Sequence, residues 1–519
     1  MACSAPAPKD GYEQMKQLDG SLTAVPAEDA YRTAYEIFVY SFCDSNGDGI
    51  GDLPGVRSRL DYVCQEMGFN EIWLMPVCPS PSYHKYNVQD YMAIDPQYGT
   101  MEDFDALLSD CHARNVRVIT DLVLNHTSTE HPWFKAAAEY LLGLSEGQQP
   151  SVEDCPYLDY YFFSREGGSG YSQLYDSGWF YESRFSWDMP DLNLDSEAVR
   201  GEIREILSFW LNRGVDGFRL DAVTSYYTGS SERNIAFLAW LKETAASIQP
   251  DAYFVAEAWT DQNEYASYYA SGIDSFFDFA FADKNGLIAS LVSGRIPASA
   301  YASRMEAEEA LYRSYHPQAI NAPFYTNHDM GRSAGYYPGD DGTKVKLAGA
   351  LNLLMSGNAF VYYGEEIGMK GAGKDENKRL GMIWEADSAT LGICKGPDGA
   401  EPQENKFGSV AEQREDPASI LTWFCWAIAI RNAFPVISHG ATAAVETLSS
   451  DAVSVFTRTA DGYDPVCIAV NLGSEPVSID LGSLDYRTLT AVLNTSAEVI
   501  TLDGTALKLP AGSIAVLTQ

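Results

Sequence analysis

The sequence is poor in positive charge and has no long apolar run. It holds 35 Lys and Arg residues against 72 Asp and Glu residues, a formal net charge of −37. Such an acidic surface repels phosphate backbones and anionic lipids, which argues against nucleic acid and membrane surfaces as partners. No apolar stretch reaches the roughly 18 residues of a spanning helix, so we expect no transmembrane segment. A neutral substrate or a bound cation is compatible with this charge.

Paired cysteine motifs are also missing. The nine cysteines are an odd number without a CxxC pair, so neither a disulfide framework nor a zinc site is predicted. Cys3 opens a stretch of low hydrophobicity that runs to about Asp29. One interpretation of residues 1–30 is the tether of an extracellular or cell-surface lipoprotein with a lipid on Cys3, and the other is a disordered tail.

With 46% hydrophobic residues, the chain can form sizeable cores. From Tyr31 to about Pro435, short apolar strands alternate with amphipathic helices, which is typical of a parallel sheet. The predicted strands are Tyr35–Phe42, Glu71–Val77, Val116–Leu124, Gly217–Ala222, Ala252–Ala258, Ser275–Phe281, Ala322–Thr326 and Ala359–Tyr363. Eight such units indicate an α/β fold of the (β/α)8 TIM-barrel type. An open doubly wound sheet is the alternative, but no Gly-rich phosphate turn follows the first strand.

One connection of this barrel is too long. The helix that serves the fourth strand begins only near Ser196, so residues 127–195 are predicted to form an inserted subdomain after strand three, rich in aromatic residues. Long insertions at this end of a barrel commonly wall the active site. The barrel then comprises residues 31–126 and 196–437.

Beyond Pro435 the helical period stops. Alternating stretches such as Val466–Val470 and Ile514–Val516, broken by Gly, Asp and Pro turns, predict a C-terminal antiparallel β-sandwich domain over residues 438–519. This domain either covers apolar barrel surface or binds carbohydrate.

The segment GFRLDAVT, Gly217–Thr224, carries two charges on an apolar strand. Arg219 and Asp221 alternate with Phe218 and Leu220 and so share one face. A buried charge is costly unless it is paired or used. The pair is therefore either a structural ion pair or an aspartate nucleophile that the guanidinium keeps ionised.

Polar groups cluster at four predicted strand ends. They are Asp121, Asn125 and His126 on the third strand, Arg219 and Asp221 on the fourth, Glu257 on the fifth, and His328 and Asp329 after the seventh. Catalytic groups of barrel enzymes lie at these ends. An ionised Asp221 beside a protonated Glu257 would suit a retaining glycosidase, in which the two carboxyls are roughly 5–5.5 Å apart. His126 and His328 are expected to be neutral donors to hydroxyls.

These motifs together resemble glycoside hydrolase family 13, the α-amylase family. The matching segments, in the family's order, are HKYNVQDY (84–91), DLVLNH (121–126), MPDLN (189–193), GFRLDAVT (217–224), EAW (257–259) and TNHD (326–329). The resemblance covers about residues 31–519. Each motif alone is weakly specific, but the ordered set is highly specific.

The resemblance implies Asp221 as nucleophile, Glu257 as acid/base and Asp329 as transition-state stabiliser. It further implies that Arg219 orients Asp221 and that His126 and His328 bind hydroxyls of the cleaved sugar. Tyr86 would be the stacking platform there. Asp121 and Asn125 would be structural.

The chain departs from the family pattern at several positions. Thr224 and Ser225 replace a Lys-His pair that contacts sugar beyond the cleavage point in many α-amylases. Lys85 replaces a usual glycine and Asn87 a usual aspartate. Ala222 is similar to α-1,4-specific members, whereas α-1,6-specific ones tend to have valine.

A separate motif follows the first strand. Asp44, Asn46, Asp48, Ile50 and Asp52 place oxygen ligands at alternate positions between glycines, as at the start of an EF-hand calcium loop. The twelfth position is Gly55, so the bidentate glutamate is missing. The loop is either a structural Ca²⁺ site, as in family relatives that share it, or an Asp/Asn/Gly turn.

The resulting expectation is a retaining hydrolase of α-1,4-glucosidic bonds in starch or malto-oligosaccharides, which acts as a monomer on an α-glucan. An exo-acting α-glucosidase, a neopullulanase-type enzyme and a transglycosylase remain alternatives. A catalytically inactive glucan-binding protein is a further alternative, although such proteins usually lack one of the three carboxylates.

Overall fold

A closed barrel of eight parallel strands forms the centre of the molecule. The computed structural model describes residues 10–15, 25–26, 28–387 and 392–519, and Cys3 lies outside these residues. The sheet order is β10-β9-β8-β7-β3-β2-β1-β11, and a parallel bridge from Phe324 to Phe360 joins the two ends. The strands are β1 Thr33–Ile37, β2 Glu71–Leu74, β3 Arg117–Leu122, β7 Gly217–Leu220, β8 Tyr253–Ala256, β9 Ser275–Phe277, β10 Ile320–Ala322 and β11 Ala359–Tyr362. The predicted TIM barrel is confirmed.

The strands are shorter than predicted, and two end early for a physical reason. The first strand ends at Ile37, and a helical turn, α2 Val39–Phe42, follows it. The seventh, β10, stops at Ala322 because Pro323 has no N–H to donate to a ladder. His328 and Asp329 therefore come from a loop and not from a strand tip.

Alternate residues of the strands point into the barrel. A buried cluster that includes Ala34, Trp73, Ile119, Val255 and Phe277 fills its lower interior. Because residues i and i+2 share a face, the next inward positions belong to the polar residues at the strand ends. They are Glu36 above Ala34, Asp121 above Ile119, Arg219 and Asp221 above Gly217, and Glu257 above Val255. The strand period thus gathers these groups at one mouth.

Gly217 lies at the start of β7, where two strands approach closely. A Cβ atom there would lie 1.9 Å from the carbonyl oxygen of Tyr253 on β8. No side chain fits in that space, so glycine sets the spacing of the two strands that carry Asp221 and Glu257.

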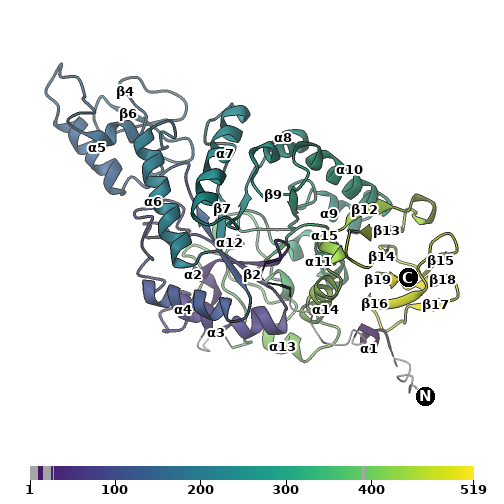
Figure 1. Cartoon of the computed structure of the whole chain (residues 1–519). Helices are drawn as coiled ribbons and strands as arrows, with labels where there is room; N and C mark the ends of the chain where they lie inside the picture. Colours follow the sequence, from purple (N-terminus) through teal and green to yellow (C-terminus); the bar gives the residue numbers. More distant parts are fainter. Residues whose placement is uncertain (1–9, 16–24, 27, 388–391) are drawn as a thin grey trace.

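Helices surround the barrel, and their ends follow sequence signals (Figure 1). The longer helices are α4 Met101–His112, α6 Glu197–Arg213, α7 Ser231–Ile248, α10 Ala300–Tyr315, α11 Gly342–Leu353 and α14 Ile420–Ala433. The predicted helix before β7 is α6, capped by the Ser196 hydroxyl and ended by Gly214 at φ 107°. Thr100 and Asp103 form a capping box at the start of α4.

The remaining helical segments are short. They are α3 Leu53–Ser58, α8 Gln262–Ser267, α9 Leu287–Val292, α12 Asp375–Lys378, α13 Val410–Arg414, α15 Val436–His439, η1 Asp61–Glu66, η2 Pro156–Tyr160, η3 Tyr268–Ser271, η4 Ser333–Tyr336, η5 Glu365–Ile367 and η6 Glu446–Leu448. None of the helices in the described part of the chain is long and apolar enough to cross a membrane.

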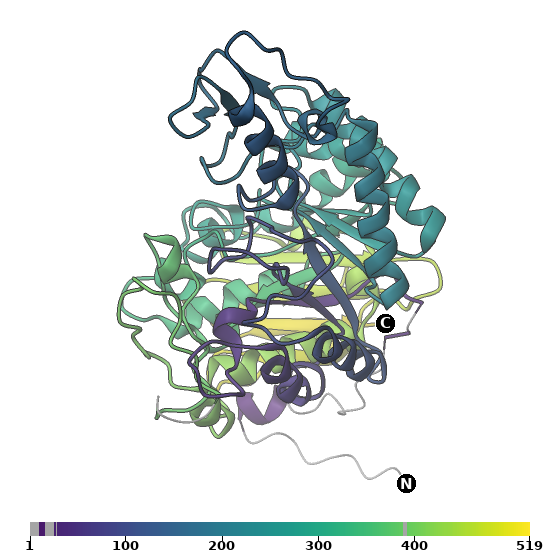
Figure 2. The same ribbon diagram turned by 90° about the vertical axis from the view of Figure 1, so that its left-hand side faces the viewer.

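The segment after β3 forms a small antiparallel subdomain beyond the barrel. It contains α5 Pro132–Gly143 and a sheet of β4 Phe163–Ser164, β6 Phe180–Glu182 and β5 Tyr171–Gln173. Figures 1 and 2 show it projecting from one end of the molecule. It returns beside β3, where the Leu192 N–H bonds the Asn125 carbonyl at 2.9 Å. The predicted insertion therefore stands over the barrel mouth.

The C-terminal part folds into two antiparallel sheets. One contains β12 Ala441–Ala444, β13 Val453–Thr459, β14 Val466–Asn471, β19 Ser513–Thr518 and β16 Thr488–Asn494, in that order. The other contains β15 Val477–Asp480, β18 Ala506–Leu509 and β17 Thr501–Asp503.

A short helix within the predicted tether, α1 Gly11–Met15, packs against this C-terminal part. The buried Gln14 side chain donates to the Ile500 carbonyl at 2.7 Å and accepts from the Ile500 N–H at 2.9 Å. The Asn494 amide donates to the Gly11 carbonyl at 2.9 Å.

Candidate active site

Arg219 is the centre of the polar cluster at the barrel mouth. Its guanidinium is fully buried and lies 2.6 Å from Asp121, 2.6 Å from Asp221 and 3.0 Å from Glu257. One guanidinium therefore holds three carboxyl groups from three neighbouring strands. It brings Asp221 and Glu257 together, because Asp221 accepts a hydrogen bond from this planar group and Glu257 forms an ion pair with it.

Glu257 holds its proton to a higher pH than Asp121 does. Its burial raises the pKa to about 7, with the Asp221 and Asp329 charges adding to the effect and Arg219 opposing it. Its Oε2 atom accepts the Ala222 N–H at 3.1 Å, which ties the residue after Asp221 to Glu257. Glu257 and Asp221 are thus in different environments, as an acid and a nucleophile require.

Tyr86 and Asp121 lie beneath these groups. The Tyr86 hydroxyl is 2.7 Å from Nε2 of His328 and 3.3 Å from Asp121, and its ring stacks on His328 at 5.4 Å. Asp121 also accepts from Nε1 of Trp73 at 3.0 Å. Its side chain is fully buried, and desolvation raises its pKa to about 6 against the opposing charge of Arg219. Asp121 supports the arrangement from below.

Asp329 lies on the opposite side of the mouth and keeps one third of its side chain exposed. It contacts His328 at 3.1 Å and Arg379 at 2.8 Å. Burial opposes ionisation of Asp329, but these two cations outweigh it and hold its pKa well below its usual range.

His328 differs from the neutral donor expected from the sequence. Burial favours the neutral ring, but Asp329 and Glu36 outweigh it and raise the pKa to about 10. The two neighbouring carboxyls therefore favour the protonated ring.

Sequence reasoning missed Arg379 and Glu36. Arg379 donates to Asp329, to the His328 carbonyl at 3.1 Å and to the Tyr83 hydroxyl at 3.0 Å. It directly follows the four-residue helix α12, in a segment after β11 where no periodicity marks it. Glu36 had one available signal, a charged residue inside the apolar strand β1.

His126 joins the mouth to the inserted subdomain. Its Nε2 atom is buried and has no hydrogen-bond partner among the described residues, and burial lowers its pKa. Its ring lies 5.4 Å from that of Phe185, which is half exposed on the returning loop of the insertion. A buried donor without a partner is suited to a ligand hydroxyl.

Two of the positions at which the sequence departs from the family pattern have a structural explanation. Lys85 adopts φ 66°, a conformation typical of glycine, and its buried ammonium pairs with Asp95 at 2.7 Å. The Asn87 amide donates to Asp188 of the insertion at 3.0 Å. Both residues thus fix the loop that carries Tyr86.

The predicted calcium loop, residues 44–52, is ordered by its own acidic groups. Asp44 accepts the N–H groups of Asn46, Gly47 and Gly49 at 2.6–3.0 Å. Asp52 accepts from Ser45 and Asn46.

Carboxylates alone do not form a metal site here. In the described ranges, no three His, Cys, Asp or Glu side chains gather closely enough to hold a metal ion. The predicted ligands also include the Asn46 amide oxygen and the Ile50 carbonyl oxygen. Calcium binds oxygen ligands of both these kinds together with carboxylates.

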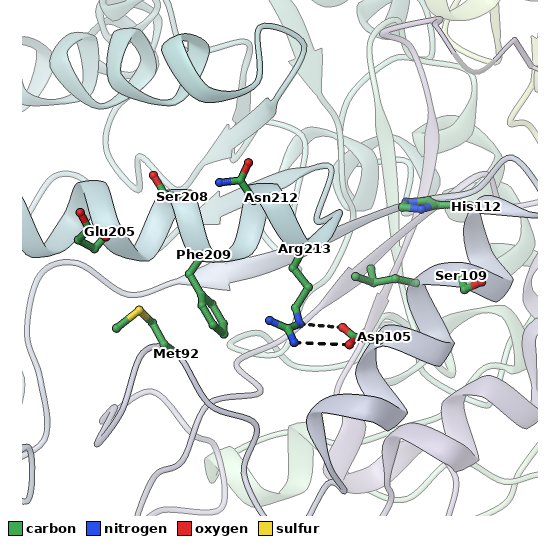
Figure 3. A pocket seen from close by; sticks show the side chains of 10 residues that line it. Met92, Asp105, Ser109, His112, Glu205, Ser208, Phe209, Asn212 and Arg213 are labelled. Atoms are coloured by element: carbon green, nitrogen blue, oxygen red, sulfur yellow. Dashed lines mark hydrogen bonds and ion pairs between the residues drawn. The ribbon is translucent and has the colours of Figure 1, made fainter.

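Two cavities lie near or outside the mouth. One of about 330 Å³, between the insertion and the loop after β7, is lined by residues that include Asn125, Asp191 and Tyr226. Another, a groove of about 800 Å³, lies on the outside between α4 and α6 (Figure 3). There Arg213 pairs with Asp105 at 2.7 Å, and none of the predicted site residues lines it.

Comparisons with known proteins agree with these observations. The α-amylase catalytic-domain family matches residues 36–440. Alpha-amylase 3 of Dictyoglomus thermophilum is 40% identical over 361 residues, which is 68% of this chain and 67% of that protein. The solved structure of Eubacterium rectale Amy13B is 51% identical, with a TM-score of 0.93 over 95% of this chain and 96% of that chain. The α-amylase of H. orenii is 32% identical, with a TM-score of 0.81 over 95% and 100%. Other relatives are named glucan 1,6-alpha-glucosidase, 33% identical, and trehalose synthase, 29% identical.

Proposed function

Because the chain belongs to the α-amylase family of glycoside hydrolases, we propose that it cleaves α-1,4-glucosidic bonds of starch or malto-oligosaccharides by double displacement. The observation that carries this proposal is the contact of one buried guanidinium, Arg219, with both Asp221 and Glu257. That contact supports a short carboxyl separation, roughly the 5–5.5 Å of retaining enzymes.

In the proposed reaction Asp221 attacks the anomeric carbon of the bound sugar. Glu257, protonated near neutral pH, gives its proton to the departing glycosidic oxygen. A covalent glycosyl–Asp221 ester forms. Glu257, now a base, takes a proton from water, which attacks the ester and releases the product.

Asp329 and the histidines would position the sugar. An ionised Asp329 accepts hydrogen bonds from sugar hydroxyls and favours the positive charge of the transition state. His126 donates from its unsatisfied Nε2–H, and Tyr86 supplies the ring on which the sugar packs.

The test is the variant Asp221→Asn, with maltoheptaose as the substrate. The amide is similar in size but cannot attack, so turnover should fall by about 10⁴-fold or more. Asp251→Asn, at an exposed position ahead of β8, is the matched control. Activity of Asp221→Asn near that of the wild type contradicts the assignment.

We also propose a structural Ca²⁺ ion in the loop of residues 44–52, held by Asp44, Asn46, Asp48, Asp52 and the Ile50 carbonyl. The ion would neutralise the carboxylates and fix the loop beside the first strand. Chelation with EGTA should lower the melting temperature of the wild type, and calcium should restore it. In Asp48→Asn, chelation should have a smaller effect, and an equal effect in both proteins contradicts the site.

The product pattern from maltoheptaose, amylose and pullulan separates this function from the alternatives. Random early products indicate endo cleavage, glucose alone an exo-acting α-glucosidase, longer products a transglycosylase, and panose a neopullulanase-type enzyme. A glucan-binding protein without activity would give no products.

The proposed setting is extracellular or at the cell surface, with a lipid on Cys3. The proposed domains are residues 1–30, 31–126 with 196–437, 127–195, and 438–519. Mass spectrometry of the chain isolated from its natural host would detect the lipid.

A further inference from the structure

Glu36 is a buried carboxyl that the proposed chemistry does not use. It lies on the inward face of β1 with 1% of its surface exposed. In register it pairs with Trp73 on β2 and Tyr362 on β11, so both neighbouring strands enclose it. A carboxyl so far from water requires a partner.

That partner is His328, which lies 292 residues away in sequence. Nδ1 of His328 is 2.6 Å from Oε1 of Glu36. Its other nitrogen, Nε2, is 3.1 Å from Asp329 and 2.7 Å from the Tyr86 hydroxyl. An ionised carboxylate can only accept, so with Glu36 and Asp329 both ionised the ring carries a hydrogen on each nitrogen.

Burial raises the pKa of Glu36 and the charge of Asp329 adds to this, whereas His328 and Arg219 oppose it. The carboxyls of Asp121 and Glu257 favour the cationic form of His328. The summed charge of Asp121, Asp329 and Glu36 stabilises a cation between them.

Of the two carboxylates at His328, Glu36 is the one that water cannot replace. Its side chain is 1% exposed, whereas that of Asp329 is 33% exposed. Asp329 faces the mouth, where solvent reaches it, whereas Glu36 contacts the ring from the closed side.

We propose that Glu36 is a positioning residue that keeps His328 doubly protonated and fixes its ring against Asp329 and Tyr86. This inference rests on the proposed role of Asp329 in the reaction. Asp329 is held ionised beside the sugar through a buried cation that Glu36 sets in place, so a residue of the first strand acts on the mouth through one histidine.

Glu36→Gln tests the charge while it keeps the shape, because the amide oxygen still accepts the Nδ1–H. Glu71→Gln is the matched control, a buried glutamate on β2 at the other end of the barrel. The first measurement is the ¹⁵N shift of the His328 ring nitrogens, assigned with His328→Gln. In the wild type both nitrogens should stay protonated to about pH 9, and in Glu36→Gln the ring should titrate about two pH units lower.

The second measurement is kcat/KM for maltoheptaose above pH 7. Loss of the Glu257 proton should lower it about tenfold per pH unit in the wild type and in Glu71→Gln. In Glu36→Gln a second proton is lost, so the decline should approach about a hundredfold per pH unit. A purely structural role would lower all values equally and leave this slope unchanged.

A neutral His328 in the wild type at pH 7, or an unchanged titration in Glu36→Gln, overturns the proposal. If Glu36→Gln does not fold, the wild-type titration decides alone. The ring titration of Asp221→Asn separates the two proposals, since that variant should be inactive and still contain the cation.

Discussion

Replacing Arg219 with leucine tests whether one guanidinium holds the mouth together. The change removes a fully buried cation that lies within 3.0 Å of three carboxyls. Removing one partner of a buried ion pair costs about 3–5 kcal/mol. Glu257 is half protonated near pH 7, so the charges left unpaired are chiefly those of Asp121 and Asp221. We therefore expect a loss of about 4–5 kcal/mol at pH 7.5.

The loss should depend on pH in one direction. Without Arg219 the pKa values of Asp121 and Glu257 in the folded state rise further above the unfolded value of about 4, because the guanidinium opposes both shifts. The folded variant then binds protons that the unfolded chain does not, so its stability falls as pH rises from about 4 through the raised values. At pH 5 the loss should be smaller than at pH 7.5 by about 2 kcal/mol.

Calorimetric melting at pH 5.0 and 7.5 measures both effects. A loss of 4–5 kcal/mol corresponds to about 5 °C if the barrel and its insertion, roughly 400 residues, unfold together. Arg213→Leu is the control, since its pair with Asp105 is partly exposed and is worth under about 1 kcal/mol. Equal losses for Arg219→Leu at both pH values, or a loss no larger than that of Arg213→Leu, would refute the reasoning.

Three further predictions follow from particular contacts. The kcat/KM of the wild type should fall as pH rises above about 7, because Glu257, with a pKa of about 7, loses the proton that it donates. A pH profile of kcat/KM with maltoheptaose measures this fall. A flat profile to pH 9 contradicts the prediction. Gly217→Ala should yield little folded protein, because its Cβ atom would lie 1.9 Å from a carbonyl oxygen of β8. Gly201→Ala on α6 is the control: its Cβ would meet no atom within 4 Å, so its free energy of unfolding in denaturant should rise by about 0.5–1 kcal/mol. Equal effects of the two changes would refute the packing argument. Gln14→Ala should cost about 1–3 kcal/mol in urea unfolding, since it leaves Ile500 without its partner, and should not alter kcat; a change in kcat would show that α1 acts on the mouth.

The barrel could be predicted because its signals are local. Apolar strands with glycine and serine at the helix ends set the order of units, and the period of two placed Arg219, Asp221 and Glu257 on one face. The predicted end of the seventh strand was wrong. Apolar residues after Pro323 suggested that the strand continues to Thr326, but β10 ends at Ala322 because Pro323 has no N–H for the ladder.

Partners distant in sequence could not be predicted in this way. The charge of His328 depends on Glu36, and that of Asp329 on Arg379. No spacing rule connects residues that meet only after the barrel closes.

The docking of α1 determines which side of the molecule holds the residues that begin at Gly11. Its hydrogen bonds join it to the segment around β16, the edge strand of the C-terminal sheet, on the side of the molecule away from the inserted subdomain (Figures 1 and 2). Gly11 is therefore held against the C-terminal sheet and not against the eight strands of the barrel. An attachment at that end would leave the opening turned outward, free to meet a polymer larger than the protein itself.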